Sequence, residues 1–343
     1  MNHQIYIRRA LELARRAGSA TKANPQVGAV LVHKNRIIGE GYHMAYGKSH
    51  AEVNAVGSVK EQDRHLIKDS TIYVSLEPCC FVGKTPACTS LIINNEIKKV
   101  VISYTDKTPE VSGQGIKILR DKGIEVIENI LEEEGKILAE PRNILADEKR
   151  PYVILKYALS QDGFLSREDQ QIWLTNSFSK RLVHKWRSEV DAIMVGTNTA
   201  RVDDPELTNR LYFGSNPLRV VIDKEEKLSK DLKIFNQEAE TILLTEEHGN
   251  TSDESVISFE KGKLNWSQIL TKLGERNIKT LFVEGGAGLL NSIYESGLWD
   301  ESRVFVSTSS LQKGLTINAP DDAIPYQELK IGNDKLVQSF KKR

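Results

Sequence analysis

Cysteine is scarce in this chain of 343 residues, with three residues that all lie between positions 79 and 88. So few thiols, so close together, cannot build a disulfide framework, and their clustering indicates metal binding in a reducing compartment. Basic and acidic residues both number 47, so no net positive field attracts a polyanion. The sequence also lacks a bilayer-length apolar run and an N-terminal signal core. We therefore expect a cytoplasmic protein with neither membrane nor nucleic-acid partners. The balanced total charge is also compatible with a local basic groove that binds nucleic acid, so this alternative stays open.

The length is too great for one ordinary core, so two domains are expected. Strand-like and helical stretches alternate in both halves, which predicts α/β domains with ligands at the carboxyl ends of their strands. Residues 140–151 interrupt this alternation, because they are charged, include Pro141 and Pro151, and offer few apolar anchors. We place the boundary there, which gives a domain over 1–147 and another over 150–343.

The apolar pattern predicts helices over 4–17, from about 50, between and after the strands 99–104 and 124–127, and near 177–188, 265–276 and 287–297. Thr85-Pro86 marks a further helix start, because Thr is a good N-cap and Pro a good first helical residue. It predicts strands over 27–33, 36–40, 71–76, 99–104, 124–127, 152–159, 192–195, 219–223, 241–245, 280–283 and 303–307. No internal repeat is visible.

One motif carries recognisable chemistry: His50-Ala51-Glu52, followed by Pro78-Cys79 and then Cys88. One imidazole and two thiolates supply three zinc ligands and leave the fourth position to a reacting water, whereas a structural zinc site closes all four. Glu52 follows His50 by two residues and leaves the helix in another direction, which suits proton transfer better than ligation. The order His-x-Glu and then Pro-Cys is the signature of zinc nucleobase deaminases. We predict His50, Cys79 and Cys88 as zinc ligands and Glu52 as the catalytic residue.

Simpler explanations exist for each part of this motif. Ser49 to Glu52 has the pattern of a helix capping box, and the three cysteines could be inert buried thiols. Neither explanation accounts for the gathering of every cysteine in one short stretch behind a proline.

Several motifs of the first half together resemble a known family: Asn24-Pro25-Gln26-Val27-Gly28, Gly41-Tyr42-His43, His50-Ala51-Glu52-Val53, and Glu77-Pro78-Cys79 with Gly83-Lys84-Thr85-Pro86 and Cys88. They are similar to the deaminase half of the bifunctional riboflavin-biosynthesis deaminase–reductases. Eight residues separate Cys79 from Cys88, whereas cytidine-type and tRNA-adenosine deaminases have two. The resemblance implies a cytidine-deaminase-like three-layer αβα domain. It also implies that Asn24, His43 and Lys84 bind a phosphoribosylaminopyrimidine. Without the resemblance, the simpler interpretations are that Asn24 belongs to a turn, that His43 is a loop histidine and that Lys84 is a solvated charge.

The second half resembles the reductase half of the same family, which has a dihydrofolate-reductase-like α/β fold. The matching runs include Asp191 to Thr199, Asp203 to Thr208, Arg219 to Asp223 and Val283 to Gly286. The resemblance implies that NADPH is held by Ala158, Trp173, Thr199, Asp203, Gly286, Ala287 and Gly288, in a run that continues to Ser292. It implies that the substrate is held by Arg187, Leu207, Arg210 and Glu284.

Local chemistry agrees with parts of this assignment. Residues 284–288 follow a strand and open a helix, so their backbone N–H groups can approach a pyrophosphate, although a tight turn is the commoner reason for such glycines. Arginine suits a sugar phosphate because its fork binds two oxygens, but either arginine could instead form a surface ion pair. The alternative for Trp173 is core packing, and Lys156 could be a family active-site lysine or a solvated strand residue.

The sequence departs from the family at Phe81, where the family has a histidine, and at Gln171, where it has a serine. Cys80 and Ala87 stand where the family often has serine and proline. Our hypothesis is an enzyme of riboflavin synthesis that uses Zn²⁺ to remove an exocyclic amine from a pyrimidine and NADPH to reduce the attached ribosyl group. The alternatives are a tRNA or nucleoside deaminase with an appended domain, and an enzyme-derived protein whose deaminase half is silent. NADPH against NADH and a homo-oligomeric state stay open.

Overall fold

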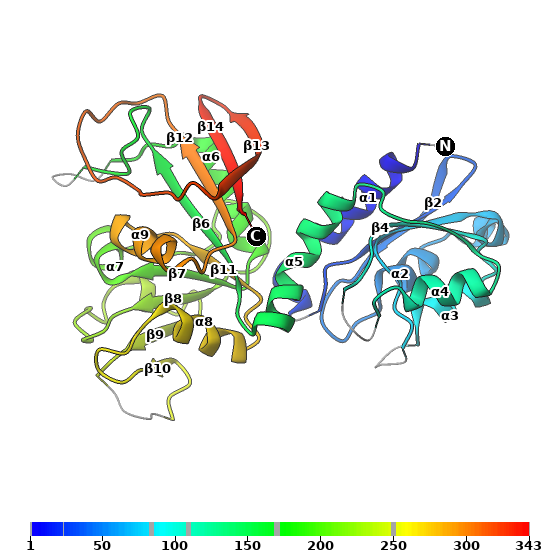
Figure 1. Cartoon of the computed structure of the whole chain (residues 1–343), viewed down its shortest axis with the longest axis horizontal. Coiled ribbons are helices and arrows are strands. Elements are labelled where there is room, and N and C mark those ends of the chain that lie inside the picture. The colour runs from blue at the N-terminus through cyan, green and yellow to red at the C-terminus, as the bar shows by residue number, and fades with distance from the viewer. Residues whose placement is uncertain are drawn as a thin grey trace. The chain divides into compact units, whose positions relative to one another are not determined.

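The computed structural model describes residues 2–22, 24–81, 86–107, 111–167, 172–247 and 252–342. These residues divide into two compact units, Met1–Asp147 and Glu148–Arg343 (Figure 1). No helix in the described ranges combines the length and the apolar character that crossing a membrane requires.

The first unit is built on a five-stranded sheet in the order β2-β1-β3-β4-β5. Its strands are β1 (Gly28–His33), β2 (Arg36–Tyr42), β3 (Thr71–Leu76), β4 (Lys99–Tyr104) and β5 (Glu125–Ile127). Its helices are α1 (His3–Arg15), α2 (Ala51–Gly57), α3 (Cys88–Asn94), α4 (Gln114–Asp121) and α5 (Glu132–Glu148), with 3₁₀ turns η1 (Gly18–Thr21) and η2 (Glu61–Asp69).

Alternation along β1 explains why this sheet carries helices on both faces. Ala29 and Leu31 are buried in the cluster that includes residues of α2, α3 and α4, whereas Val30 and Val32 are buried in the cluster that includes α1. Successive residues of a strand point to opposite faces, so one apolar strand supplies two cores. The result is the predicted three-layer αβα fold (Figure 1).

The second unit is built on a nine-stranded sheet in the order β10-β9-β8-β7-β11-β6-β12-β14-β13. Its strands are β6 (Tyr152–Leu159), β7 (Ala192–Gly196), β8 (Leu218–Ile222), β9 (Thr241–Thr245), β10 (Val256–Ser258), β11 (Thr280–Val283), β12 (Glu301–Val306), β13 (Ala323–Ile331) and β14 (Asp334–Lys341). Its helices are α6 (Ser177–Glu189), α7 (Thr197–Asp203), α8 (Trp266–Glu275) and α9 (Ala287–Ser296), with the 3₁₀ turn η3 (Lys233–Phe235).

The strands from β10 to β12 in this sheet are parallel, whereas β14 and β13 run antiparallel at one edge. Helices α8 and α9 bury Leu273 and Leu290 in the main core, while Trp186 of α6 packs against Phe282 and Phe305. Parallel strands bring their carboxyl ends to one edge, where the connections to α6, α7 and α9 create room for ligands.

Three features differ from the sequence-based expectation. Residues 140–148 are the last part of α5, a helix that contains Pro141 and buries Ile144 in this stretch, so a helix continues where we expected an interruption. Helix α3 begins at Cys88, after Ala87, rather than at 85–86. Helix α7 and strands β10, β13 and β14 were not predicted.

Candidate active sites

The first candidate site lies at the carboxyl end of β3, between α2 and α3. Cys79 follows β3 after a short turn, Cys88 is the first residue of α3, and His50 is the residue that caps α2. Their ligand atoms all lie within 4.8 Å of one another. The fold therefore brings His50 together with two cysteines that lie 29 and 38 residues further along the chain.

The spacing of these atoms fits a tetrahedral zinc ion. The Nδ1 atom of His50 lies 3.2 Å from Sγ of Cys88 and 3.5 Å from Sγ of Cys79. Zinc bonded to nitrogen at about 2.0 Å and to sulfur at about 2.3 Å needs nitrogen–sulfur separations of about 3.6 Å. Two sulfurs and one imidazole are also the donor chemistry that zinc prefers.

The protonation of the two thiols is unequal. A hydrogen bond from Cys88 to the sulfur of Cys79, aided by His50 and opposed by burial, lowers the pKa of Cys79 well below its ordinary value. The backbone N–H of Cys88 donates to the same sulfur over 3.3 Å. Cys79 is therefore a ready thiolate ligand, as expected for a sulfur that accepts a hydrogen bond from the N-terminus of α3 and lies beside a histidine.

Glu52 lies in the first turn of α2 and is almost completely buried, with 3% of its surface exposed. Burial raises the pKa of this carboxyl to about 7, and a hydrogen bond with the Cys88 thiol opposes the rise. That hydrogen bond places Glu52 against the cysteine cluster. The capping-box explanation fails, because the capping residue is His50 rather than Ser49 and no side chain caps the helix.

Two of the residues predicted to bind the pyrimidine lie beside this cluster. His43 is buried and packs edge-on against His50, with ring centroids 5.5 Å apart. Its Nδ1 faces the Ser49 carbonyl at 3.1 Å and its Nε2 faces the Asn24 amide at 3.2 Å. Since a carbonyl only accepts, His43 carries its proton on Nδ1 and accepts from Asn24. The third predicted residue, Lys84, lies outside the described residues, as does Gln171.

Glu77 is a residue of this site that the sequence did not single out. Its carboxylate accepts backbone N–H groups of Asp106 at 3.2 Å, Gly113 at 2.9 Å and Ile116 at 3.2 Å. Glu77, two residues before Cys79, thus joins the end of β3 to the start of α4. Gly115 closes the same contact, because a Cβ there would lie 2.3 Å from the Pro78 carbonyl. Phe81 lies nearby with half of its surface exposed.

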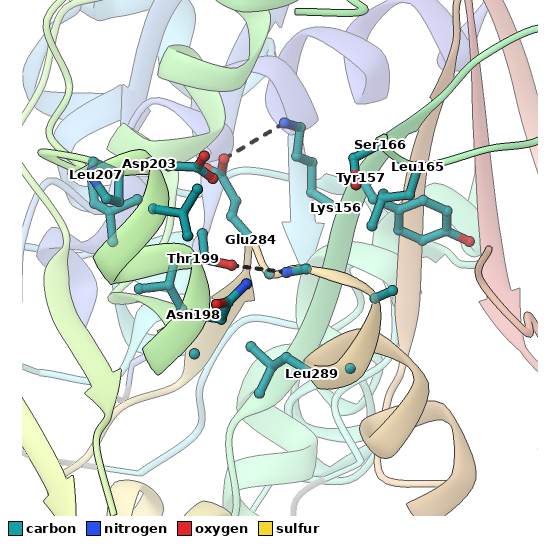
Figure 2. A pocket seen from close by; sticks show the side chains of 18 of the residues that line it. Lys156, Tyr157, Leu165, Ser166, Asn198, Thr199, Asp203, Leu207, Glu284 and Leu289 are labelled. Atoms are coloured by element: carbon teal, nitrogen blue, oxygen red, sulfur yellow. Dashed lines mark hydrogen bonds and ion pairs between the residues drawn. The ribbon is translucent and has the colours of Figure 1, made fainter. Parts of the chain in front are cut away.

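The second candidate site is a cavity of about 2070 Å³ in the unit Glu148–Arg343 (Figure 2). A pocket for one drug-sized ligand spans about 300–1,000 Å³, so this cavity has room for two ligands. It is lined by every residue predicted to hold NADPH or the reductase substrate: Ala158, Trp173, Arg187, Thr199, Asp203, Leu207, Arg210, Glu284, Gly286, Ala287 and Gly288.

The glycine-rich turn lies where a dinucleotide needs it. It links β11 to the N-terminus of α9, and the Gly286 N–H donates to the Thr199 hydroxyl over 3.1 Å, which fastens the turn to α7 (Figure 2). Trp173 is 75% exposed, so the alternative that it packs in the core is wrong. The Lys180 ammonium lies 5.4 Å from the centroid of its ring. A large cavity, a helix N-terminus and an exposed aromatic ring fit a dinucleotide cofactor.

A mostly buried trio of charges lines the cavity. Glu284 accepts two hydrogen bonds from the Arg187 guanidinium, at 2.8 and 3.0 Å. Its carboxylate also lies 3.6 Å from the Lys156 ammonium (Figure 2). Burial would raise the pKa of Glu284, but Arg187 and Lys156 outweigh it and hold the pKa at about 2. Lys156 is thus an ion-pair partner rather than a solvated strand residue.

The other predicted arginine is more open. Half of the Arg210 side chain is exposed, and it pairs with Glu206 four residues earlier. Its backbone N–H donates to Nδ1 of His184 over 3.0 Å, so His184 is an acceptor at that nitrogen. Burial and the neighbouring Arg187 and Arg210 lower the pKa of His184 to about 4, which keeps this ring neutral.

Comparisons with known proteins agree with both sites. Residues 1–104 match the cytidine and deoxycytidylate deaminase zinc-binding region, and residues 151–311 match the RibD C-terminal domain. The riboflavin biosynthesis protein RibD of Aquifex aeolicus is 36% identical, with 98% of each chain covered. That of Escherichia coli is 34% identical over 91% of this chain and 89% of its own. A crystal structure from Thermotoga maritima, described as a diaminohydroxyphosphoribosylaminopyrimidine deaminase/5-amino-6-(5-phosphoribosylamino)uracil reductase, superposes with a TM-score of 0.87. It is 36% identical and covers 99% of this chain and 98% of its own.

The fold and the two sites define a zinc deaminase fused to a nucleotide-dependent reductase. The chain belongs to the RibD family of riboflavin biosynthesis proteins. The predicted fold class, family, bifunctional activity and cofactors, Zn²⁺ and NADPH, are confirmed. The relatives favour this function over a tRNA or nucleoside deaminase with an appended domain.

Proposed function

We propose that the first unit removes one exocyclic amine from 2,5-diamino-6-(5-phosphoribosylamino)pyrimidin-4(3H)-one, and that the second unit reduces the ribosyl group of the product to a ribityl chain. The observation that carries this proposal is the pairing, in one chain, of the His50, Cys79 and Cys88 cluster with the separate large cavity. Zinc hydrolysis and hydride transfer need different surroundings, and each unit offers one of them.

In the deaminase unit, His50, Cys79 and Cys88 would hold zinc, which when bound supplies the Lewis acidity for hydrolysis near neutral pH. Glu52 would take a proton from the attacking water and deliver it to the departing amine. Its support is that the carboxylate is buried beside the cysteines and has a pKa of about 7, which suits proton transfer near neutral pH. Asn24 and His43, which bond each other beside His50, would orient the ring.

In the reductase unit, the turn from Gly286 to Gly288, with Ala158, Trp173, Thr199 and Asp203, would hold NADPH, which when bound supplies the hydride. The chain's own task is to align the sugar carbon with that cofactor and to exclude water. Leu207, Arg187 and Glu284 would form the surroundings of the substrate.

Between the two arginines, Arg210 is the better placed to meet the sugar phosphate. Arg187 directs its donors to Glu284 and to the Thr208 carbonyl, whereas Arg210 is half exposed at the cavity and pairs with a single carboxylate. A phosphate can displace a surface carboxylate at little cost, because exposed ion pairs are worth less than about 1 kcal/mol.

The test is a two-signal assay. The protein, loaded with zinc, is given the diaminopyrimidine phosphate and NADPH, and ammonia release is followed together with the absorbance of the nicotinamide ring. We expect both signals, with ammonia first. NADPH consumption only when deaminated substrate is supplied would instead identify a protein with a silent deaminase half, and the absence of both signals would refute the proposal. A cytoplasmic location stays a prediction, and the oligomeric state was left open by the sequence.

A further inference from the structure

The segment 204–210, which follows α7, has an unusual backbone. Asp204 and Leu207 adopt left-handed conformations with φ of 40° and 54°, although neither is a glycine. Such conformations cost free energy and persist when the surroundings enforce them. The segment carries Leu207 and Arg210, both of which line the cavity. Its shape therefore bears directly on the substrate site.

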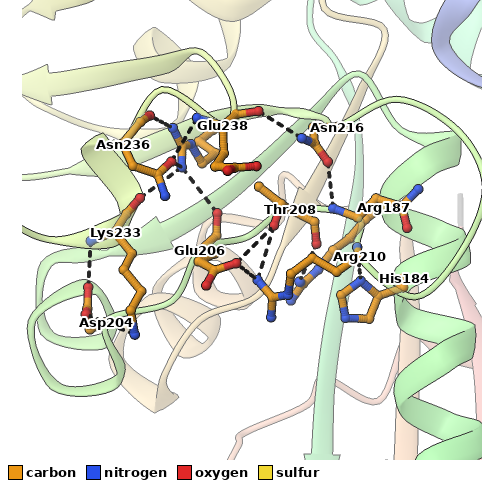
Figure 3. A network of polar contacts seen from close by, with 12 residues as sticks. His184, Arg187, Asp204, Glu206, Thr208, Arg210, Asn216, Lys233, Asn236 and Glu238 are labelled. Carbon is orange, nitrogen blue, oxygen red and sulfur yellow. Dashed lines mark hydrogen bonds and ion pairs between the residues drawn. The ribbon is translucent and has the colours of Figure 1, made fainter.

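Side chains, rather than other backbone, hold this segment in place (Figure 3). Among the described residues, the backbone hydrogen bonds of 205–210 outside helices and strands all run to side chains. They join the Glu206 carbonyl to Arg219 (3.3 Å), the Thr208 carbonyl to Arg187 (3.1 Å), the Asn209 N–H to Asn216 (2.8 Å) and the Arg210 N–H to His184 (3.0 Å).

Arg219 differs from the other anchors because its side chain is fully buried and, within the described residues, does not line the cavity. Besides Glu206, its guanidinium donates to the Lys233 carbonyl at 3.0 Å, to the Asn236 side chain at 2.9 Å and carbonyl at 2.5 Å, and to the Ala239 carbonyl. Arginine stays protonated in proteins, so this is a buried cation whose two terminal nitrogens donate to neutral oxygens, while its Nε has no hydrogen-bond partner among the described residues. Burying a charge is costly, so a merely space-filling role would favour an apolar residue.

These bonds tie the substrate segment to the connection between β8 and β9. The same two stretches are joined a second time, because the Lys233 N–H donates to the Asp204 side chain over 2.7 Å (Figure 3). Residues 233–239, of which Lys233 also lines the cavity, thus form a support for segment 204–210.

We propose that Arg219 is a positioning residue of the reductase, which fixes segment 204–210 so that Leu207 and Arg210 meet the substrate. This inference rests on the proposed reductase function. The NADPH side has its own fastening, the bond between Gly286 and Thr199, so loss of Arg219 acts on the pyrimidine substrate and spares the cofactor.

The experiment compares the full-length, zinc-loaded wild-type protein with Arg219→Lys and Arg219→Met. Lysine keeps the charge but cannot reach five oxygens with one ammonium group. A misplaced Arg210 loses a charge-assisted hydrogen bond to the substrate, so we expect the KM of the deaminated substrate to rise by about 10- to 100-fold. The KM of NADPH should change less than about threefold, because the cofactor turn is held by a different hydrogen bond, from Gly286 to Thr199. Ammonia release by the other unit of the same molecules is the internal control.

Arg150→Met is the matched control for a merely structural effect. Arg150 is another buried arginine of the same unit, paired with Asp300 at 2.7 and 3.0 Å. Its loss should lower the unfolding temperature while leaving the substrate KM unchanged. A substrate KM that stays at the wild-type value in a folded Arg219 variant would overturn the proposal. So would equal rises for NADPH, or an equal rise in Arg150→Met.

Measurement of backbone amide hydrogen exchange provides a test that depends neither on turnover nor on the folding of Arg219→Met. We expect the amides of residues 206–210 to exchange faster in Arg219→Lys and, to a smaller extent, in Asn236→Ala, which removes one acceptor of the guanidinium. Unchanged exchange in both variants would overturn the proposal even if Arg219→Met fails to fold. If the wild-type protein reduces no pyrimidine, the proposed function fails, whereas the exchange result still decides whether Arg219 shapes the segment.

Discussion

The substitution Glu284→Gln isolates the energetics of the reductase cavity. Glu284 is mostly buried, and it is bonded by Arg187 and faced by Lys156. Glutamine keeps the shape of the side chain but removes the charge, so two cations are left in a confined space without their shared counter-ion. Removing one partner of a buried ion pair costs about 3–5 kcal/mol.

The pKa of Glu284 gives a second measure of the same quantity. The two cations hold this pKa at about 2, below its ordinary value of 4.5. A difference of that size corresponds to about 3 kcal/mol of stabilisation by the charged form. Because the folded-state pKa is depressed, the stabilisation is complete above pH 4.5 and is lost as the pH falls through about 2. We therefore expect Glu284→Gln to lower the free energy of unfolding by about 3 kcal/mol at neutral pH, and by progressively less in that acid window.

Urea unfolding followed by tryptophan fluorescence measures this change in the correct unit, because all four tryptophans, at 173, 186, 266 and 299, lie in the reductase unit. Glu328→Gln is the control, since Glu328 forms a pair with Lys335 that is about half exposed. The reasoning would be refuted by a loss below about 1 kcal/mol, the worth of an exposed pair. It would equally be refuted by a loss that does not depend on pH.

Three further predictions test other parts of the account. Cys79→Ser should abolish stoichiometric zinc binding, whereas Cys80→Ser should bind zinc as the wild type does, as measured by elemental analysis. Stoichiometric zinc in Cys79→Ser would show that Cys79 is not a zinc ligand. Gly28→Ala should lower the unfolding temperature of the first unit by forcing apart α1 and β1, because its Cβ would lie 2.0 Å from the Ala10 carbonyl oxygen. We expect a loss of about 1–3 kcal/mol by circular dichroism, and an unchanged transition would contradict the packing. Trp173→Ala should weaken NADPH binding in a fluorescence titration while changing stability by less than about 0.5 kcal/mol, and the opposite pattern would assign Trp173 to the core.

The strands of the sheets could be predicted from the sequence because their residues are buried and β-branched. The expected strands 71–76, 99–104, 152–159, 241–245 and 280–283 coincide with β3, β4, β6, β9 and β11. Strand β13 could not be predicted from the sequence, because it is an edge strand whose residues are mostly exposed and therefore show no alternation of apolar and polar residues. The extension of α5 over residues 140–148 was missed, because Pro141 and the charged residues outweighed the single buried Ile144 in the sequence pattern.

Residue type and order were enough to nominate the metal ligands, because few chemical purposes explain one histidine and two cysteines in that pattern. Sequence could not reveal that Arg187 is already engaged by Glu284, or that Arg219 is buried against carbonyl groups, since both depend on which segments the fold brings together. The sequence alone does not distinguish an arginine that binds a substrate from one that pairs with a carboxylate or holds a loop. Glu77 is another example, because its partners lie about thirty residues further along the chain.

Removal of zinc tests the central claim that one chain carries two separate reactions. The protein is stripped with a chelator, its metal content is verified, and ammonia release and NADPH oxidation are followed with the diamino substrate and with the deaminated substrate. We predict that ammonia release disappears and returns when zinc is restored, while oxidation of NADPH with the deaminated substrate continues throughout. Metal-free protein that still liberates ammonia at the full rate would contradict the account.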